Sequence, residues 1–134
     1  MVNISTKGIY AVAAMHALSH SPNNRSMQIK EISAMTQISH GYLEQILSQL
    51  KKSSLVTSTR GAKGGYKLSR PANKIIILEV VEALEGELFS VHENVGATVV
   101  LEAFWADMQD KLRNLFSLKL SELDQAYQPF CYDI

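Results

Sequence analysis

The sequence predicts a mainly α-helical fold that contains one small β-hairpin. Three segments before residue 54 carry apolar residues at helical spacing. Two short alternating segments, rich in β-branched residues, then flank the letters GAKGG. A long amphipathic stretch follows at about 98–117. Two short helices joined by a three- or four-residue turn, and followed by a two-stranded hairpin, form a winged helix-turn-helix.

The first helix is predicted over the letters STKGIYAVAAMHALSH, with Ser5 or Thr6 as its cap. Its apolar positions are Ile9, Val12, Ala13, Met15 and Leu18. The letters QIKEISAMTQ predict a short second helix with Ile29 and Ile32 inward. Ser39 is a suitable N-cap for the third helix, HGYLEQILSQLKKS. Its apolar spacing runs through Tyr42 or Leu43, Ile46, Leu47 and Leu50.

The glycine-rich stretch TRGAKGGYKL at 59–68 has two possible meanings. A glycine loop that holds a nucleotide phosphate is followed by a helix N-terminus, and it has the spacing GxGxxG or GxxxxGK[ST]. Here the letters YKLS predict a strand after the loop, Pro71 ends that strand, and neither spacing is present. The glycines therefore allow positive φ angles and let the backbone approach another group closely. The hairpin is interpreted as a wing.

The remainder of the chain, residues 75–134, is predicted to pair two copies. ILEVVEALEG reads as a helix that stops at Gly86, and ELFSVHENVG reads as irregular. In the long helix, apolar residues recur at steps of four, three, four and three, and Phe104 and Phe116 widen the stripe. The stripe consists of Leu101, Trp105, Met108, Leu112 and Leu115. We expect a dimerisation helix, with packing back onto its own domain as the alternative.

Charge divides the chain into two unlike parts. Residues 1–74 hold ten Lys/Arg and two acids, a net of +8, whereas residues 75–134 hold three Lys/Arg and eleven acids, a net of −8. This asymmetry favours a basic DNA-binding domain at 1–74 that meets a polyanion, followed by a dimerisation or regulatory region at 75–134. The alternative is two oppositely charged halves that fold against each other.

The predicted DNA-binding residues come from the third helix and the wing. Residues at the start of the second helix of a helix-turn-helix reach base edges in the major groove. Gln45 can pair with adenine and Glu44 can accept from a cytosine amino group, while Arg60 suits a narrow minor groove. The candidates for phosphate contacts are Arg60, for which the minor groove is the alternative, and Lys7, Lys51, Lys52, Lys63 and Lys67. The full set is Lys7, Ser39, His40, Gly41, Tyr42, Glu44, Gln45, Arg60, Gly61, Lys63, Gly64 and Gly65. For Glu44, His40 and each lysine, the plainer interpretation is a solvated surface.

Several other features point away from catalysis and secretion. The only cysteine, Cys131, excludes an internal disulfide and a CxxC-type metal site, and we interpret it as a tolerated thiol rather than a redox group. His16 and His20 have a zinc-binding spacing, but no third ligand lies nearby in sequence, so no metal site is predicted. No catalytic set stands out, so we expect no enzyme. The run after Lys7 imitates a signal peptide but lacks a cleavage site, and no segment is long enough to span a membrane, so we expect a cytoplasmic protein.

Four stretches, ISTKGIYAV, YLEQIL, LVTSTRGAKGGYKLSRPA and VVEALEG, together resemble the Rrf-type winged-helix repressors of bacteria. The resemblance covers residues 3–86 and the long helix in outline. It implies a homodimer that binds palindromic or A·T-rich operator DNA, with the long helix crossing onto the other subunit. It also implies that the DNA-reading positions are Ser39, Gly41, Tyr42, Glu44, Gln45 and Arg60.

The chain departs from the family at two places. Cluster-binding members carry three cysteines between the EG helix and the long helix, whereas GELFSVHENVGATVV has none, and His92 alone cannot replace them. The chain therefore resembles the cluster-free cysteine-metabolism branch, which implies no cofactor and an effector protein as the source of the signal. Ile76 stands where many members have a capping serine, so we expect a different start to that helix.

Two other functions compete with DNA binding at this stage. The acidic, aromatic C-terminal half suits a protein-interaction module that uses the winged-helix shape without reading DNA. A nucleotide-dependent enzyme is the third hypothesis, and the strand after the glycine loop argues against it.

Overall fold

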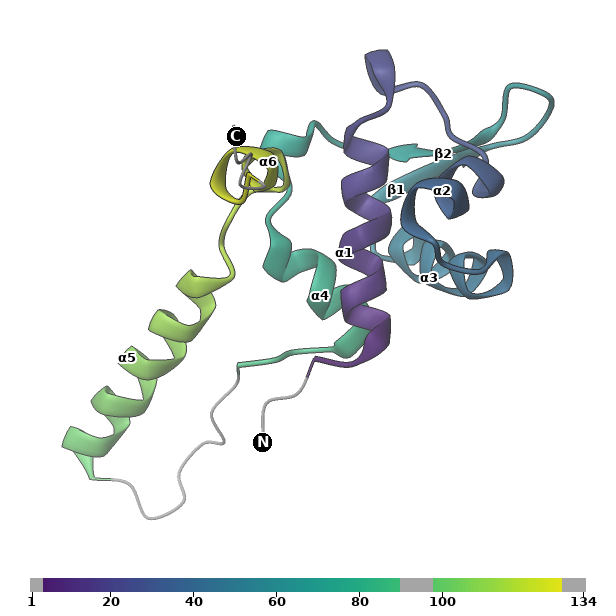
Figure 1. Ribbon diagram of the computed structural model, residues 1–134. Helices are drawn as coiled ribbons and strands as arrows, with labels where there is room; N and C mark the ends of the chain where they lie inside the picture. The colour runs from purple at the N-terminus through teal and green to yellow at the C-terminus, as the bar shows by residue number, and fades with distance from the viewer. Residues whose placement is uncertain (1–3, 90–97, 129–134) are drawn as a thin grey trace, which may run out of the picture.

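The computed structural model describes residues 4–89 and 98–128, and it confirms the predicted fold class. One two-stranded antiparallel hairpin lies at the edge of a body made of helices (Figure 1). The helices and strands are α1 (Thr6–Ser19), α2 (Ile29–Thr36), α3 (His40–Lys52), β1 (Val56–Thr59), β2 (Gly65–Leu68), α4 (Ile77–Glu85), α5 (Val99–Leu115) and α6 (Leu123–Ala126). Short 3₁₀ turns cover Pro22–Asn24, Ala72–Lys74 and Leu120–Glu122. None of the described helices is long and apolar enough to cross a membrane.

Helix α1 is the centre of the body, with α2, α3 and the hairpin on one side and α4 on the other (Figure 1). Its buried face agrees in part with the predicted apolar positions: Met15 and Leu18 are buried, but Ile9 is 58% exposed. Three alanines that were not among the predicted positions, Ala11, Ala14 and Ala17, are buried as well. Apolar residues surround much of this helix, so hydrophobicity alone does not select a face. The small alanines do, because they let α1 lie close to its neighbours.

The cap of α1 also differs from the prediction. Ser5 occupies the N-cap position, but its side chain does not cap the helix. Instead a carboxylate oxygen of Glu85, at the end of α4, accepts from the amides of Ser5 at 2.9 Å and Gly8 at 3.3 Å, and from the Ser5 hydroxyl. The hydroxyl hydrogen bond is the main reason that the pKa of Glu85 lies below its usual value. A carboxylate from α4 thus neutralises the free N–H groups of α1.

The turn between α2 and α3 has the length expected of a helix-turn-helix. Gln37 adopts the left-handed conformation with φ 63°, and Ile38 is buried. The Ser33 hydroxyl donates to the Ile38 carbonyl at 2.6 Å. Ser39 is the N-cap of α3, as predicted, and its hydroxyl accepts from the Tyr42 amide at 3.4 Å.

The hairpin is held against the body by a third backbone segment. Val56 pairs with Leu68 and Thr59 with Gly65 across the two strands. Met27 then exchanges two hydrogen bonds of 2.8 Å with Tyr66. Gly65 has φ 140°, and a Cβ atom there would lie 2.2 Å from the Met27 carbonyl oxygen. The prediction of close backbone approach at the glycines is therefore confirmed, and the approaching backbone is the chain's own.

We expect Gly65→Ala to destabilise the fold by about 2–4 kcal/mol, because it combines a strained φ with a backbone overlap. Gly41→Ala is the matched control, since a Cβ atom at Gly41 meets nothing within 4 Å. Within α3 that change should stabilise by about 0.5–1 kcal/mol. Urea unfolding followed by circular dichroism measures both. Equal stability of the two variants would contradict the close approach at Gly65.

Helix α4 begins without a side-chain cap, as expected from Ile76. The amide of Ile76 donates to the Glu79 carboxylate at 3.0 Å, and the next two amides, of Ile77 and Leu78, donate to the carbonyls of Leu118 and Phe116. The segment that follows α5 therefore satisfies the first turn of α4. Burial opposes ionisation of Glu79, but hydrogen bonds from the Ile76 amide and the Arg70 guanidinium lower its pKa overall.

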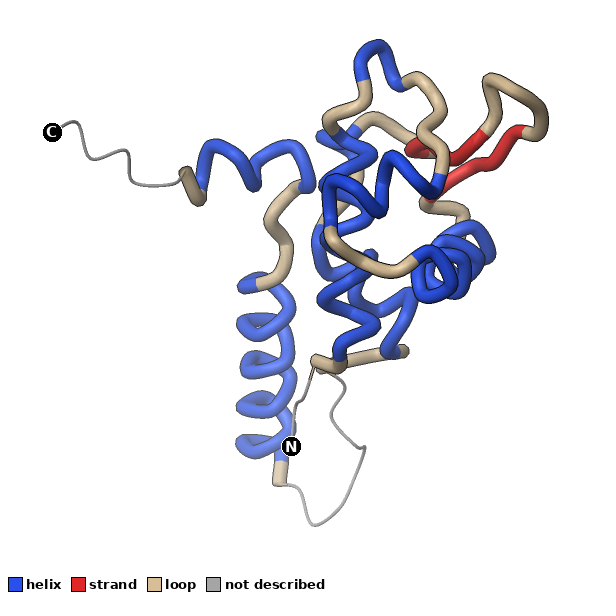
Figure 2. The backbone as a smooth tube through the Cα atoms, turned by 45° about the vertical axis from the view of Figure 1, so that its right-hand side comes forward, coloured by secondary structure: helices blue, strands red, loops and turns tan. Residues whose placement is uncertain are grey.

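Helix α5 extends away from the body and is attached at its C-terminal end (Figures 1 and 2). No residue of this helix is buried. Arg113 anchors the attached end through two hydrogen bonds to Glu82 of α4, at 3.1 and 3.3 Å. Phe116 does not widen the exposed stripe, because it is half-buried and its ring packs 5.3 Å from that of Phe89. The alternative in which α5 packs back onto its own domain is not seen.

Candidate nucleic-acid interface

Helix α3 has one buried face and one exposed face. Leu43, Ile46, Leu47 and Leu50 are buried in the core. The opposite face carries most of the predicted reading positions, all exposed: Ser39, His40, Gly41, Glu44 and Gln45. The Ser39 cap fixes where this helix begins, so the polar residues of its first two turns face outward together.

Tyr42 differs from its neighbours on α3. It is half-buried, and its ring meets that of Tyr10 edge-on at a centroid distance of 5.2 Å. This geometry is typical of a stable aromatic pair. Tyr42 thus helps to hold α3 on α1, and a role in reading DNA stays a prediction.

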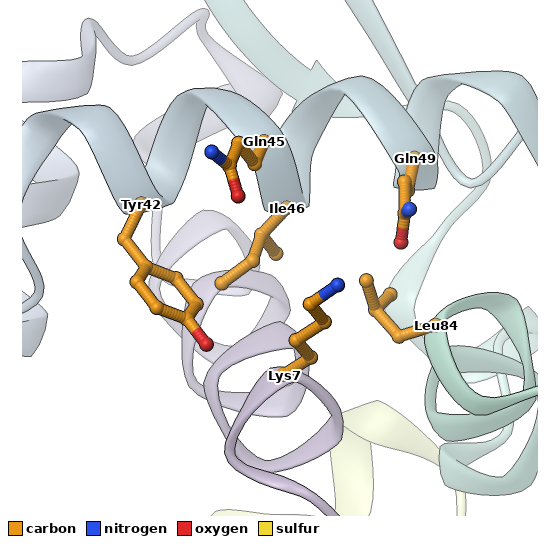
Figure 3. Close-up of a pocket in the computed structure, with 6 residues that line it drawn as sticks. All are labelled: Lys7, Tyr42, Gln45, Ile46, Gln49 and Leu84. Atoms are coloured by element: carbon orange, nitrogen blue, oxygen red, sulfur yellow. The ribbon is translucent and has the colours of Figure 1, made fainter.

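Lys7 is brought to α3 by the fold. It lines a small pocket between α1, α3 and α4 together with Tyr42, Gln45, Gln49 and Leu84 (Figure 3). The Lys7 side chain is exposed and extends toward α3 (Figure 3). The Gln49 side-chain oxygen is buried here and has no hydrogen-bond partner among the described residues. Lys7 therefore adds positive charge beside the exposed face of α3.

The wing presents its basic residues at the tip. Arg60 and Lys63 are exposed, and neither forms a hydrogen bond or ion pair with any residue in the described part of the chain. The loop is nevertheless fixed, because Nε2 of the Gln28 side chain donates to the Ala62 carbonyl at 3.2 Å and Gly64 is buried. Gly61 has φ 104° in the turn. A fixed loop with free cationic side chains is suited to a polyanion.

The other lysines of this region, Lys51, Lys52 and Lys67, differ in their contacts and exposure. Lys51 donates from Nζ to the Ser58 hydroxyl at 2.7 Å, so it bridges α3 and β1. Lys52 is exposed, and Lys67 is half-buried on β2. Glu44 is exposed and has no partner within residues 4–89 and 98–128. An unpaired acid among these cations is better placed to select a base than to bind phosphate.

Comparison with known proteins shows which family has this winged-helix chain as a member. The family model of Rrf2, described as an iron-dependent transcriptional regulator, matches residues 4–125. The chain belongs to the Rrf2 family of transcriptional regulators. The chain is 34% identical to the HTH-type transcriptional regulator IscR of Photorhabdus laumondii over an alignment of 136 positions, which covers 91% of the chain and 79% of the relative. It is 39% identical to IscR of Cereibacter sphaeroides over 72% of the chain, and there it spans 64% of the relative's length.

The solved structures agree with the sequence relatives. CymR, the global cysteine regulator of B. subtilis, superposes with a TM-score of 0.80 at 29% identity, covering 96% of this chain and 100% of CymR. The chain is thus a winged-helix DNA-binding transcriptional regulator and not an enzyme. The Rrf-type resemblance of the sequence is confirmed at the level of the family.

One further cluster contains the His16 and His20 pair together with a third residue that had no sequence signal. The structure places Asp124 of α6 against His16 and His20 of α1. The 3₁₀ turn Leu120–Glu122 and α6 itself were not predicted. The letters LDQA are too short for a helical period, and only the fold brings them to α1.

Proposed function

We propose that this protein is a homodimeric repressor that reads a two-fold operator with α3 and the wing. The observation that carries the proposal is the exposed polar face of α3 beside a fixed wing with unpaired cations, in a chain of this family. In this arrangement the start of α3 enters the major groove, and Glu44 and Gln45 read base edges. Ser39, His40 and Gly41 lie at the same end of the helix and allow close approach.

Arg60 and the lysines supply the remaining contacts. We assign Arg60 to the minor groove beside the major-groove site, where narrow A·T-rich DNA attracts arginine. Lys7, Lys52 and Lys63 contact phosphates on either side of α3. Gly61, Gly64 and Gly65 act through the shape of the wing rather than through direct readout.

The dimer is proposed from the apolar stripe of α5. Leu101, Phe104, Trp105 and Leu112 are each between 41% and 48% exposed, and Leu115 is 75% exposed. Met108 is half-buried in the middle of the stripe. A large apolar face on a helix that lies apart from its own body is typical of an interface. Residues 75–134 would then pair the copies, and residues 1–74 would bind one half-site each.

We also propose that the protein binds no iron–sulfur cluster. Such clusters are held by several thiolates, and the only cysteine of the sequence is Cys131. The donor set therefore does not fit the group that the family description implies. The likeness to CymR supports a position of this chain near the cluster-free branch of the family. On this proposal the protein acts in the cytoplasm and receives its regulatory signal from an effector protein.

Glu44→Ala should relax sequence preference while leaving non-specific affinity unchanged. A lost contact between a carboxylate and a cytosine amino group costs about 1–3 kcal/mol of discrimination at that base pair. Binding to operator variants with each base at every position, measured by fluorescence anisotropy, maps the effect. Glu102→Ala removes the same charge from the exposed surface of α5 and serves as the control. Equal profiles of Glu44→Ala and the wild type would contradict base reading by Glu44.

A salt titration tests the proposed DNA binding itself. An interface with about 6–10 phosphate contacts loses about 10³–10⁵ in affinity between about 50 and 200 mM salt. We expect a linear fall of log affinity with log salt for operator DNA. Affinity that does not change with salt would contradict the phosphate contacts.

A further inference from the structure

Three side chains that can bind a metal meet where the end of the described chain touches α1. His16 and His20 are one turn apart on α1, and Asp124 is in α6. The Nε2 atom of His16 lies 2.8 Å from one carboxylate oxygen of Asp124, and Nε2 of His20 lies 2.6 Å from the other. The two imidazole rings are 4.6 Å apart. One carboxylate thus faces both imidazole nitrogens.

We propose that His16, His20 and Asp124 bind a divalent first-row transition-metal cation of the zinc type. Imidazole nitrogen and carboxylate oxygen are preferred ligands of Zn²⁺, and three protein ligands with one open position form a common zinc site. Mg²⁺ and Ca²⁺ prefer all-oxygen sites, so two imidazoles disfavour them. No thiolate takes part, so this site is unrelated to an iron–sulfur cluster.

The observed geometry needs little change to accept the ion. The three donor atoms lie within 4.8 Å of one another. Bonds of about 2.0–2.2 Å in a tetrahedron place neighbouring donors about 3.3–3.6 Å apart. The carboxylate therefore moves away from each imidazole by a fraction of an ångström, and the imidazoles close on each other. The side chains of His16, His20 and Asp124 are 39%, 43% and 57% exposed, which leaves room for this adjustment.

The site also has an entry path and an open position. His16 and Asp124 border an open groove whose other walls are Ile9, Val12, Ala13, Leu123 and Tyr127. A cation can reach the three donors from this groove, and water can complete its coordination.

Metal binding would join two distant parts of the chain. Asp124 is separated from His16 by 108 residues and from His20 by 104. The C-terminal segment is otherwise held to the body by buried Leu120 and half-buried Leu123. An ion that binds the folded state raises thermal stability by mass action. The proposed site therefore locks α6 onto the central helix of the DNA-binding body.

Titration of the full-length, untagged protein with Co²⁺ tests this proposal. After treatment with a chelator, we expect one Co²⁺ per chain with the visible absorption of a tetrahedral nitrogen–oxygen site. Zn²⁺ should displace it and raise Tm, whereas Mg²⁺ should do neither. An intense near-ultraviolet thiolate band, or no saturable Co²⁺ binding, would overturn the proposal.

Variants identify the ligands. His20→Asn and Asp124→Asn should each weaken Co²⁺ binding by at least about 10–100-fold. Loss of a residue that only hydrogen-bonds a metal ligand already has an effect of that size. Asp107→Asn, an exposed carboxylate on α5, and Cys131→Ser should bind like the wild type. Circular dichroism of each variant shows that any loss is not caused by unfolding. If both site variants bind Co²⁺ as tightly as the wild type, the ion binds elsewhere and the proposal is overturned. None of these readouts depends on DNA binding.

Discussion

Trp105→Glu is expected to turn the dimer into a monomer and to lower operator affinity by about 10²–10⁴-fold, because two linked half-sites bind with an effective concentration that a monomer lacks. Trp105 is at the centre of the α5 stripe, is 48% exposed, and has its ring 4.9 Å from that of Phe104. In the proposed dimer a charge there would be buried in an apolar interface. Sedimentation velocity gives the oligomeric state, and fluorescence anisotropy with operator DNA gives the affinity.

Ala103→Glu is the matched control for Trp105→Glu. Ala103 is exposed on the same helix, but the period of 3.6 residues places it on the side opposite the stripe. The same charge should therefore leave the dimer and its affinity unchanged. A dimeric Trp105→Glu variant with normal affinity would show that α5 does not pair the subunits. Equal dissociation by both variants would show that the stripe is not the interface.

Arg60→Ala should weaken operator binding by about 1–3 kcal/mol, the usual cost of losing an arginine contact in a groove. Because Arg60 is exposed at the wing tip and pairs with no described residue, its removal should leave the free energy of unfolding unchanged. The effect should be larger for sites with A·T pairs beside the recognition element, since arginine favours a narrow minor groove. Anisotropy with paired A·T-rich and G·C-rich flanks measures the difference.

Lys63→Ala separates charge from groove recognition. Lys63 is in the same loop and is also exposed. Its loss should lower affinity for all sequences alike and reduce the salt slope by about 1. If Arg60→Ala behaves like Lys63→Ala for both kinds of flank, Arg60 contacts only phosphate. If neither variant changes affinity, the wing does not touch DNA.

Local signals explain why the body of the fold was predictable. The apolar period of α3, the Ser39 cap and the strand-like letters after the glycines each act within a few residues. The glycine loop was interpretable because a nucleotide site needs a helix where β2 stands. The exposed polar face of α3 follows directly from which of its residues are apolar.

Contacts between distant residues explain what was missed. Glu85 caps α1 from 77 residues or more along the chain, and Asp124 reaches His16 across 108. Neither acid has a local pattern that marks its partner. In α1, Met15 and Leu18 are buried as predicted, but Ile9 is exposed, and small alanines complete the buried face in its place. These features depend on packing, which a single sequence does not display.

Selection of bound DNA from a genomic library at physiological salt tests the central claim most directly. If two copies each read a half-site with α3 and the wing, the bound fragments should contain one enriched motif with two-fold symmetry. Its half-sites should be separated by one helical turn of DNA or a multiple of it. Recovery of fragments with no enriched motif would contradict the account of this protein as a sequence-specific dimeric regulator.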